Sequence, residues 1–399
     1  MKLLQGKRVL LCVTGGIALY KAVGLASSLR KLGVELKVAM TPAATKLVSP
    51  VTFSSVSGAS VYVDEFSVHS GWIPHTELSR WADVLVVAPA TANTVAKIAM
   101  GVADNLVTLI AMAFQKEAKV IVPTMNVRMY SNPVVEENLE RLKARGWTVV
   151  EPVEGSLACG EVGKGRYPDN EIIVDAIAAS LLPKKFRGKK VLVTAGPTRE
   201  HIDPVRFISN RSSGKMGYAL AKAARWYGSD VVLVSGPTHL PAPWGVKLIR
   251  VETANQMYEE TMKHFKGSHI VLMAAAVADY AVGEPVSKKI KKGPERLVLE
   301  LQRTVDILEE MGNQKDSQVL VGFSAETHDL EENAREKLRK KRLDAIVAND
   351  VSRPDVGFES DENEVVILTE DGVLTIEKMP KIDLALAILD FLARRFDFD

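Results

Sequence analysis

Two stretches of the chain begin with the same pattern of apolar and polar positions. A short β-branched and Leu-rich run ends in glycine at residues 6–16 (GKRVLLCVTGG) and again at residues 188–196 (GKKVLVTAG). A hydrophobic strand that runs into a glycine-bearing turn is typical of the first strand of a parallel α/β sheet. Because the two stretches lie about 180 residues apart, they predict two domains and not a solenoid.

The residues after each opening predict alternating helices and strands. In the first half the spacing predicts a helix that ends at Gly33 and a strand over 34–38, and in the second half a helix from about Met216 to Gly228. Further apolar runs that predict strands occur at residues 84–88, 120–122, 231–234, 270–273, 319–321 and 345–347. The sequence therefore predicts an α/β fold with two Rossmann-like domains and mainly parallel sheets. The polar stretch at 182–188 (LPKKFRG) is the expected linker, with domains at 1–183 and 189–399.

Composition and charge narrow the class of protein. The 399 residues are 47% hydrophobic and 25% charged, which is typical of an ordinary folded protein. A net charge of +2 lacks the basic excess of a general nucleic-acid binder. The longest apolar stretch, 270–278, is about half of what spans a bilayer, so no membrane partner is expected. Two cysteines in unlike contexts, Cys12 and Cys159, and no cleavable leader favour the cytoplasm.

In the first half, polar residues follow predicted strands at the edge where doubly wound sheets bind ligands. The turn Thr14-Gly15-Gly16 precedes a helix start, whose free N–H groups favour a phosphate, and PATANT at 89–94 follows another strand. A tight turn without a ligand explains the first loop equally well, but the two loops together favour a mononucleotide. The glycine spacing of a nicotinamide dinucleotide site is absent, which disfavours a nicotinamide oxidoreductase.

Three side chains in the first half have reactive potential, namely His75, Asn126 and Cys159. A single histidine or cysteine is more often a satisfied histidine or a small buried thiol, and we expect the latter for Cys12. Cys159 differs because glycines surround it over 155–165, a composition typical of a flap that closes on a site.

Over residues 6–182 the chain resembles the flavin-dependent cysteine decarboxylases, specifically the phosphopantothenoylcysteine decarboxylases. The motifs that carry the resemblance are TGGIA, His75, PATANT, PTMNxxM and ACG. It implies a flavodoxin-like domain that binds FMN, which supplies the difficult redox step. It also implies that His75 is the base, that Asn126 holds the substrate carboxylate and that Cys159 returns a proton. The implied FMN contacts are Gly15, Gly16, Ile17, Thr41, Thr91, Asn93 and Thr94.

In the second half, a donor-rich loop leads into the predicted helix and offers Ser212-Ser213-Gly214 as an anion seat. The segment 274–280 (AAAVADY) ends a predicted buried strand and places Asp279 at its rim, where it could take a nucleotide hydroxyl or a metal. A lysine run at 288–292 and the pair Lys337 and Lys341 could bind phosphates, although a solvated charge run is the ordinary explanation for the first.

Over residues 189–396 the chain resembles the phosphopantothenate–cysteine ligases, through VTAGPTxExIDPVRxISNxSSGxMG at 193–217. The whole chain therefore resembles the bifunctional proteins of coenzyme A biosynthesis. The likeness implies that CTP with Mg²⁺ activates 4′-phosphopantothenate as an acyl-cytidylate and that L-cysteine attacks it. Asn210 would support the acyl-cytidylate, and Lys289 would assist the attack. The implied CTP contacts are Ala275, Asp279, Lys289, Asp306, Ile307, Phe323, Lys337 and Lys341.

Three positions depart from the family pattern. Thr304 begins TVDIL where NPDIL is usual, Glu359 interrupts GFGSDEN, and Tyr130 replaces the usual Trp. The resemblance further implies a homo-oligomer, a trimer-based dodecamer with ligase-domain dimers. Two alternatives remain: a decarboxylase of peptide C-terminal cysteines, which the ligase half disfavours, and a flavin-binding regulatory subunit of the same fold without catalysis, which the reactive set disfavours.

Overall fold

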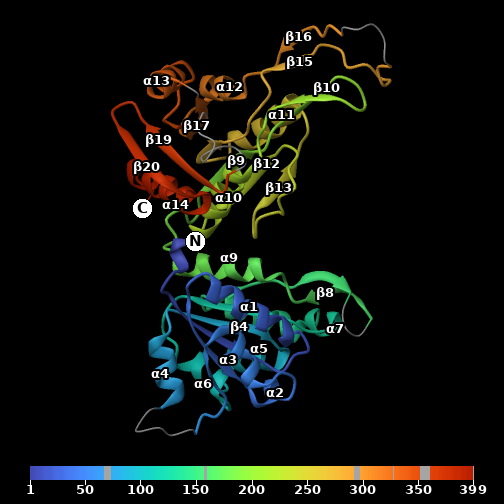
Figure 1. The fold of residues 1–399 in the computed structure, drawn as a ribbon. Coiled ribbons are helices and arrows are strands. Elements are labelled where there is room, and N and C mark those ends of the chain that lie inside the picture. The colour runs from blue at the N-terminus through green and yellow to red at the C-terminus, as the bar shows by residue number, and fades with distance from the viewer. Residues whose placement is uncertain (67–72, 157–159, 292–296, 327, 351–359, 399) are drawn as a thin grey trace. The chain divides into compact units, whose positions relative to one another are not determined.

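The computed structural model describes residues 1–66, 73–156, 160–291, 297–326, 328–350 and 360–398. The chain divides into two compact units, Met1–Leu182 and Pro183–Asp399 (Figure 1). Each unit is an α/β domain with its own mainly parallel sheet, which confirms the predicted fold class.

The first unit is built on a six-stranded sheet in the order β3-β2-β1-β4-β5-β6, with every pair parallel. The strands are β1 (Arg8–Val13), β2 (Glu35–Met40), β3 (Ser60–Tyr62), β4 (Val84–Ala90), β5 (Lys119–Pro123) and β6 (Thr148–Val149). Without the short edge strand β3, the remaining order reads 2-1-3-4-5, which is the flavodoxin-like order. A separate antiparallel hairpin comprises β7 (Val153–Ser156) and β8 (Val162–Arg166).

Helices connect the strands of the first unit. They are α1 (Leu19–Lys31), α2 (Pro42–Thr45), α3 (Pro50–Ser57), α4 (Pro74–Trp81), α5 (Ala92–Met100), α6 (Leu106–Ala113), α7 (Val127–Tyr130), α8 (Pro133–Ala144) and α9 (Asn170–Leu181), after a 3₁₀ turn at Lys2–Leu4. Local residues set their ends: Thr91 caps α5, Asn105 forms a capping box at α6, and Gly101 ends α5 with a positive φ.

The core of the first unit follows from the apolar strands. Every residue of β4 is buried, as are all residues of β1 after Arg8. A sheet buried on both faces needs such continuous apolar runs. Cys12 lies in this core with no exposed surface, and burial raises the pKa of its thiol well above the usual range, as expected for an inert buried cysteine.

The second unit is built on an eight-stranded sheet in the order β13-β12-β9-β14-β17-β18-β19-β20. Its first six strands are parallel, and the last two add an antiparallel hairpin. The strands are β9 (Lys190–Ala195), β12 (Asp230–Ser235), β13 (Lys247–Arg250), β14 (Ile270–Met273), β17 (Val319–Glu326), β18 (Ala345–Asp350), β19 (Glu362–Leu368) and β20 (Val373–Pro380). The helices are α10 (Lys215–Trp226), α11 (Ala254–Phe265), α12 (Ile307–Gln314), α13 (Leu330–Lys340) and α14 (Lys381–Arg395).

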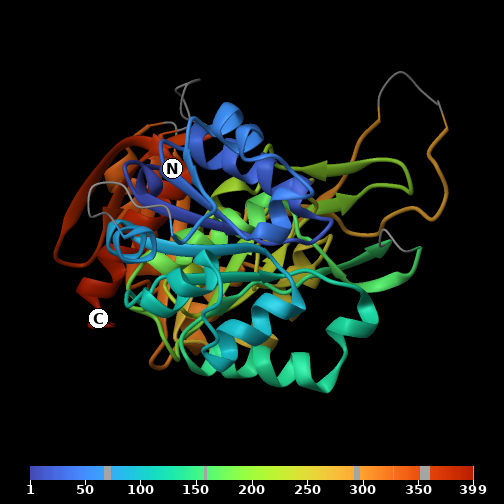
Figure 2. The same cartoon turned by 90° about the horizontal axis from the view of Figure 1, so that it is seen from below.

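Two hairpin arms leave this second sheet. One pairs β10 (Arg199–His201) with β11 (Phe207–Ser209), and the other pairs β15 (Tyr280–Val282) with β16 (Leu301–Arg303). Both views show the arms side by side, extending away from the sheet (Figure 1, Figure 2). A backbone hydrogen bond of 3.1 Å from Val286 N to Ile202 O joins them.

The expected linker at 182–188 is only partly a loose connection. Phe186 has no exposed surface, and its ring lies edge-on to Tyr227 and Phe398 at centroid distances of 5.7 and 5.9 Å. The aromatic side chain therefore belongs to the core of the second unit, although the residues around it are polar. In the described part of the chain, every helix is too short or too polar to cross a membrane.

Candidate functional site

The first candidate site lies where the strand order of the first sheet reverses, between the carboxyl ends of β1 and β4. Thr14 joins the two loops there, because its Oγ1 donates to Pro89 O at 2.7 Å and accepts from Thr91 N at 3.1 Å. The glycine turn and the PATANT loop are thus parts of one structure.

Two glycines keep this edge open. A Cβ on Gly15 would lie 2.6 Å from Ala43 Cβ, and one on Gly16 would lie 3.4 Å from Thr91 Cγ2. At Gly15 only glycine fits without displacing its neighbour. The turn thereby brings backbone N–H groups close to the start of α1, a geometry that suits a phosphate.

The predicted flavin contacts gather at the same edge. Gly15, Gly16 and Ile17 follow β1, Thr41 follows β2 as the N-cap of α2, and Thr91, Asn93 and Thr94 follow β4 at the start of α5. Because β2, β1 and β4 are neighbours in the sheet, these residues lie on adjoining loops. Ile17 and Asn93 are exposed at this edge, whereas Thr41 and Thr94 are buried. The glycine turn and the exposed residues fit a bound flavin mononucleotide.

His75 is the second residue of α4. In a parallel sheet a connecting helix runs back against the strands, so its start lies at the carboxyl edge. The Nδ1 atom of His75 is buried and has no hydrogen-bond partner among the described residues. A buried ring nitrogen without a partner is available to a ligand.

Asn126 follows β5 and caps α7, with Oδ1 accepting from Arg128 N at 2.8 Å. Its Nδ2 donates to Glu161 Oε2 at 2.5 Å, and Arg128 forms an ion pair with Glu161 at 2.9 Å. The amide of Asn126 therefore already holds a carboxylate, the chemical group that it is expected to bind in a substrate.

The hairpin β7–β8 lies directly against the segment that carries Asn126. Met125 N donates to Gly165 O at 3.2 Å, and a Cβ on Gly165 would lie 2.3 Å from Met125 O. Glycine at 165 is thus required for this close approach. Cys159, the expected proton donor, lies outside the described residues, between the two strands of the hairpin in sequence.

Tyr130, which stands where the family usually has Trp, contributes to a polar cluster. Its hydroxyl donates to Glu151 at 2.5 Å, and burial together with Glu151 raises the pKa of Tyr130. Burial acts to raise the pKa of Glu151, but hydrogen bonds from Lys164, Tyr130 and Lys143 prevail and lower it to about 2. This replacement supplies a hydrogen-bond donor to Glu151, which also binds Lys143 of α8 and Lys164 of β8.

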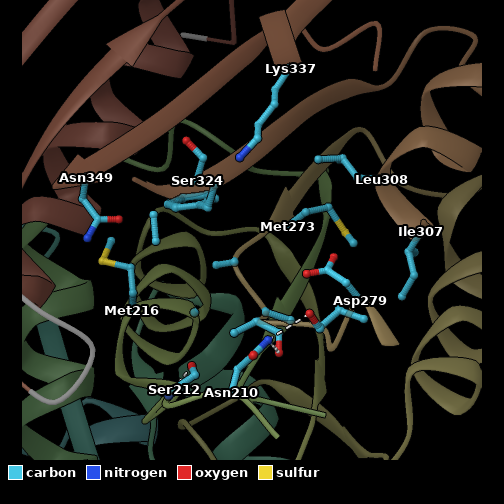
Figure 3. Close-up of a pocket in the computed structure, with 18 of the residues that line it drawn as sticks. Asn210, Ser212, Met216, Met273, Asp279, Ile307, Leu308, Ser324, Lys337 and Asn349 are labelled. Carbon is cyan, nitrogen blue, oxygen red and sulfur yellow. Dashed lines mark hydrogen bonds between the residues drawn. The ribbon is translucent and has the colours of Figure 1, made fainter. Parts of the chain in front are cut away.

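The second candidate site is a pocket of about 820 Å³ at the carboxyl ends of β14, β17 and β18 and the starts of α10, α12 and α14 (Figure 3). The site residues predicted for the second half, except Lys289, line it. They are Asn210, Ala275, Asp279, Asp306, Ile307, Phe323, Lys337 and Lys341. The pocket again lies beside the point where the strand order reverses, between β9 and β14.

Asn210 closes one side of this pocket. Its Nδ2 donates to Ala276 O at 3.2 Å and to Val277 O at 3.0 Å (Figure 3). Lys337 reaches in from the opposite side, and Asp279 lies on the side of Asn210. Cationic and anionic side chains therefore face a common space.

Carboxylates neutralise the pocket lysines that the sequence predicted. Lys337 Nζ lies 2.6 Å from Glu326 Oε1, and Lys341 Nζ lies 2.7 Å from Asp306 Oδ2. Burial acts to raise the pKa of Asp306, but the bonds from Lys341 and Glu309 N prevail and lower it. A polyanionic ligand would compete with these carboxylates for the lysines.

Sequence reasoning missed several lining residues. Lys215, bound to Asp361 at 2.6 Å, sits next to the predicted anion seat, and Ser324 adjoins Phe323. The Ser324 Oγ is buried without a hydrogen-bond partner among the described residues. Lys381 begins α14, and no motif around it in the sequence indicated a role in binding. Burial, and to a lesser extent repulsion from Lys215, lowers the pKa of Lys381 to about 8.

Lys289 does not line this pocket. It is exposed on the segment between β15 and β16, and Lys292 of the same lysine run lies outside the described residues. Of the three departures from the family pattern, Thr304 lines the pocket and its Oγ1 donates to Ala278 O at 2.6 Å. Glu359 lies outside the described residues. No group of three His, Cys, Asp or Glu side chains in the described ranges is placed to hold a metal ion.

The fold defines a two-domain α/β protein with a candidate site at the carboxyl edge of the sheet in each domain. The Flavoprotein family matches residues 2–182, and the DNA/pantothenate metabolism flavoprotein C-terminal domain family matches residues 186–396. The Coenzyme A biosynthesis bifunctional protein CoaBC of Bacillus subtilis (strain 168) is 46% identical over 98% of both chains. The protein of the same name from Escherichia coli (strain K12) is 41% identical over 99% of this chain and 98% of that one.

A solved C-terminal domain of a Coenzyme A biosynthesis bifunctional protein CoaBC is 42% identical, covering 54% of this chain and 100% of that chain with a TM-score of 0.47. The chain belongs to the family of bifunctional proteins of coenzyme A biosynthesis. It is therefore an enzyme with two activities on small molecules, a flavoprotein decarboxylase and a phosphopantothenate–cysteine ligase.

Proposed function

We propose that residues 189–399 join 4′-phosphopantothenate to L-cysteine with CTP, and that residues 1–183 decarboxylate the product to 4′-phosphopantetheine with FMN. The observation that supports this most directly is the pocket of the second unit, which all the expected nucleotide contacts except Lys289 line, from α12, α13, the end of β14 and β17. The ligase works first, because its product is the substrate of the decarboxylase.

In the ligase, the pocket residues make a poor electrophile reactive. A carboxylate resists attack by an amine at neutral pH, and transfer of a cytidylyl group turns its oxygen into part of a good leaving group. Lys337 and Lys341 would stabilise the charge on the phosphates during that transfer. Mg²⁺ would accompany the triphosphate, and Asp279 offers the hard oxygen ligand that this ion prefers.

Asn210 and Lys289 would act on the acyl-cytidylate. Asn210 lines the pocket beside the Ala276 and Val277 carbonyls, where its amide can hold the activated group. Lys289 lies on the exposed arm and would assist attack by the cysteine amine. A ligase-domain dimer would let the arm of one protomer serve the pocket of its partner.

In the decarboxylase, bound FMN would take up two electrons from the substrate thiol, which creates the electron sink that lets carbon dioxide leave, and would return them to the decarboxylated product. His75 would act as the base and accept a proton from the substrate at its buried Nδ1 atom. Asn126 would hold the substrate carboxylate in place of Glu161. Cys159 would return a proton to the decarboxylated product.

We further propose that flavin domains form trimers within a dodecamer and that the protein works in the cytoplasm.

Two single substitutions test which unit carries out which reaction. Asn126→Ala should ligate normally and accumulate 4′-phosphopantothenoylcysteine, because only the decarboxylase site changes. Lys337→Ala should ligate slowly, by about 10²–10³-fold, yet decarboxylate supplied 4′-phosphopantothenoylcysteine at the normal rate. Product masses distinguish the cases. A protein that binds flavin and forms neither product would instead be a regulatory subunit.

A further inference from the structure

Asp203 lies in the turn between β10 and β11, and its side chain has no exposed surface. Its Oδ1 accepts from Val205 N at 2.7 Å and from Arg206 N at 2.9 Å. The guanidinium of Arg206 lies 3.2 Å from Oδ2. A buried carboxylate is costly unless its oxygens are bonded, so the turn is built around this charge.

A third backbone N–H reaches the same carboxylate from the other arm. Ile290 N donates to Asp203 Oδ2 at 3.1 Å, and Arg206 Nη1 donates to Ile290 O at 3.4 Å. The backbone N–H and C=O of Ile290 are therefore both bound by the Asp203–Arg206 pair. The bond from Val286 N to Ile202 O adds a second attachment between the arms.

Ile290 directly follows Lys289, so its fixed backbone places Lys289 within one Cα step, about 3.8 Å. Residues 283–289 are all exposed, which leaves the segment few other contacts to hold it. The anchor at Ile290 therefore decides where the Lys289 ammonium can reach.

The carboxylate is ionised when it makes these bonds. Burial acts to raise the pKa of Asp203, but hydrogen bonds from the backbone N–H groups of Val205, Ile290 and Arg206, together with the Arg206 charge, prevail and lower it. An asparagine of the same size would lose the charge and one of the two accepting oxygens.

We propose that Asp203 is a positioning residue for the ligation step and that, through Ile290, it holds Lys289 in the geometry that cysteine attack on the acyl-cytidylate requires. The inference rests on the proposed role of Lys289. It assigns Asp203 to the second half-reaction alone, because Asp203 does not line the nucleotide pocket.

The test compares Asp203→Asn, Lys289→Gln and the double variant in the full chain, with 4′-phosphopantothenate, CTP and cysteine. Rapid quenching and mass spectrometry follow the acyl-cytidylate and the amide product separately. Asp203→Asn should slow amide formation by about 10²-fold, the cost of a displacement of roughly 1 Å. The acyl-cytidylate should form normally and accumulate, and KM for CTP should not change. The double variant should be no slower than Lys289→Gln, because both changes remove the same contribution.

Two further variants guard the interpretation. Ile290→Pro removes the N–H that Asp203 accepts and leaves the residues of the Asp203 turn unchanged, so it should reproduce the Asp203→Asn result. If Asp203→Asn does not fold, Ile290→Pro tests the positioning role in its place. Asp344→Asn is the matched control, because Asp344 also accepts a backbone N–H, from Leu320 at 2.7 Å, and pairs with Lys315 at 2.8 Å away from the pocket. It should leave both half-reactions unchanged.

The outcomes separate the two claims. If Lys289→Gln ligates at the normal rate, the proposed role of Lys289 is wrong. If Lys289→Gln is slow but Asp203→Asn and Ile290→Pro are normal, the positioning role is wrong. Equal slowing of both half-reactions, or effects that multiply in the double variant, would likewise overturn it.

Discussion

Lys381 is the one buried lysine among those that line the pocket in the described part of the second unit, with 6% of its surface exposed. Its neighbours are Lys215, which disfavours its charge, and Asp361, which favours it. Of the other lysines at the pocket, Lys215, Lys337 and Lys341 lie at bonding distance from carboxylates, and Lys340 is exposed. Burial thus makes Lys381 a pocket cation whose protonation changes near pH 8.

Nucleotide binding should therefore weaken as pH rises above about 8. Burial lowers the folded pKa of Lys381 from 10.5 to about 8, so the charge that attracts a phosphate is present below that pH and is lost above it. The affinity for CTP, measured by calorimetry between pH 7 and 9.5, should fall across this range. In Lys381→Arg the decline should be absent, because guanidinium stays charged. An unchanged pH profile in the arginine variant would assign the titration to another group.

Among the secondary structure elements, the β7–β8 hairpin shows how one glycine sets a contact. Gly165 allows β8 to approach Met125 closely, and the same approach brings Glu161 within reach of Asn126. The glycine-rich composition around Cys159 indicated a flap, and the structure adds a packing reason for one of those glycines.

Gly165→Ala should impair the decarboxylase and spare the ligase. Its Cβ would lie 2.3 Å from Met125 O, so the hairpin must shift and displace the Asn126 segment. We expect decarboxylation to slow by about 10²-fold, measured as carbon dioxide release from supplied substrate. Gly267→Ala is the control, because its Cβ would meet nothing nearer than 3.9 Å. Normal decarboxylation by the Gly165 variant would show that the hairpin does not position the site.

The sequence was sufficient for most elements and for the loops at strand ends. Apolar runs such as 84–88 and 270–273 became strands because parallel sheets bury both faces. The residues that follow those strands, such as Asp279, met in the pocket because carboxyl ends share one edge. Lys381 could not be found this way, since it begins the last helix and does not follow a parallel strand, so no strand-end pattern marks it.

At the scale of the whole molecule, the structure places the boundary between the units at Leu182 and Pro183, whereas the polar composition suggested a linker over 182–188. The polar stretch that suggested a linker contains Phe186, which is buried in the second unit between Tyr227 and Phe398. Its burial depends on residues about 40 and 210 positions away, which no local pattern reveals.

Phe186→Ala should destabilise the second unit alone. Removing a buried phenylalanine costs about 3–5 kcal/mol, so the unfolding transition of the ligase unit should move to lower temperature. The transition reported by flavin release should stay in place, because no core residue of Met1–Leu182 changes. Differential scanning calorimetry, together with flavin fluorescence followed over the same temperatures, distinguishes the unfolding transitions of the two units. A common shift of both transitions would mean that the units unfold together.

One chain performs both reactions in sequence, and the masses of the products distinguish this from a chain that performs only one. The purified protein, loaded with FMN, is incubated with 4′-phosphopantothenate, L-cysteine, Mg²⁺ and CTP, and all products are followed by mass spectrometry. We expect CMP, pyrophosphate, carbon dioxide and 4′-phosphopantetheine, with 4′-phosphopantothenoylcysteine appearing first, and none of these without CTP. Formation of 4′-phosphopantothenoylcysteine without its decarboxylation, or no ligation at all, would show that the chain does not perform both reactions.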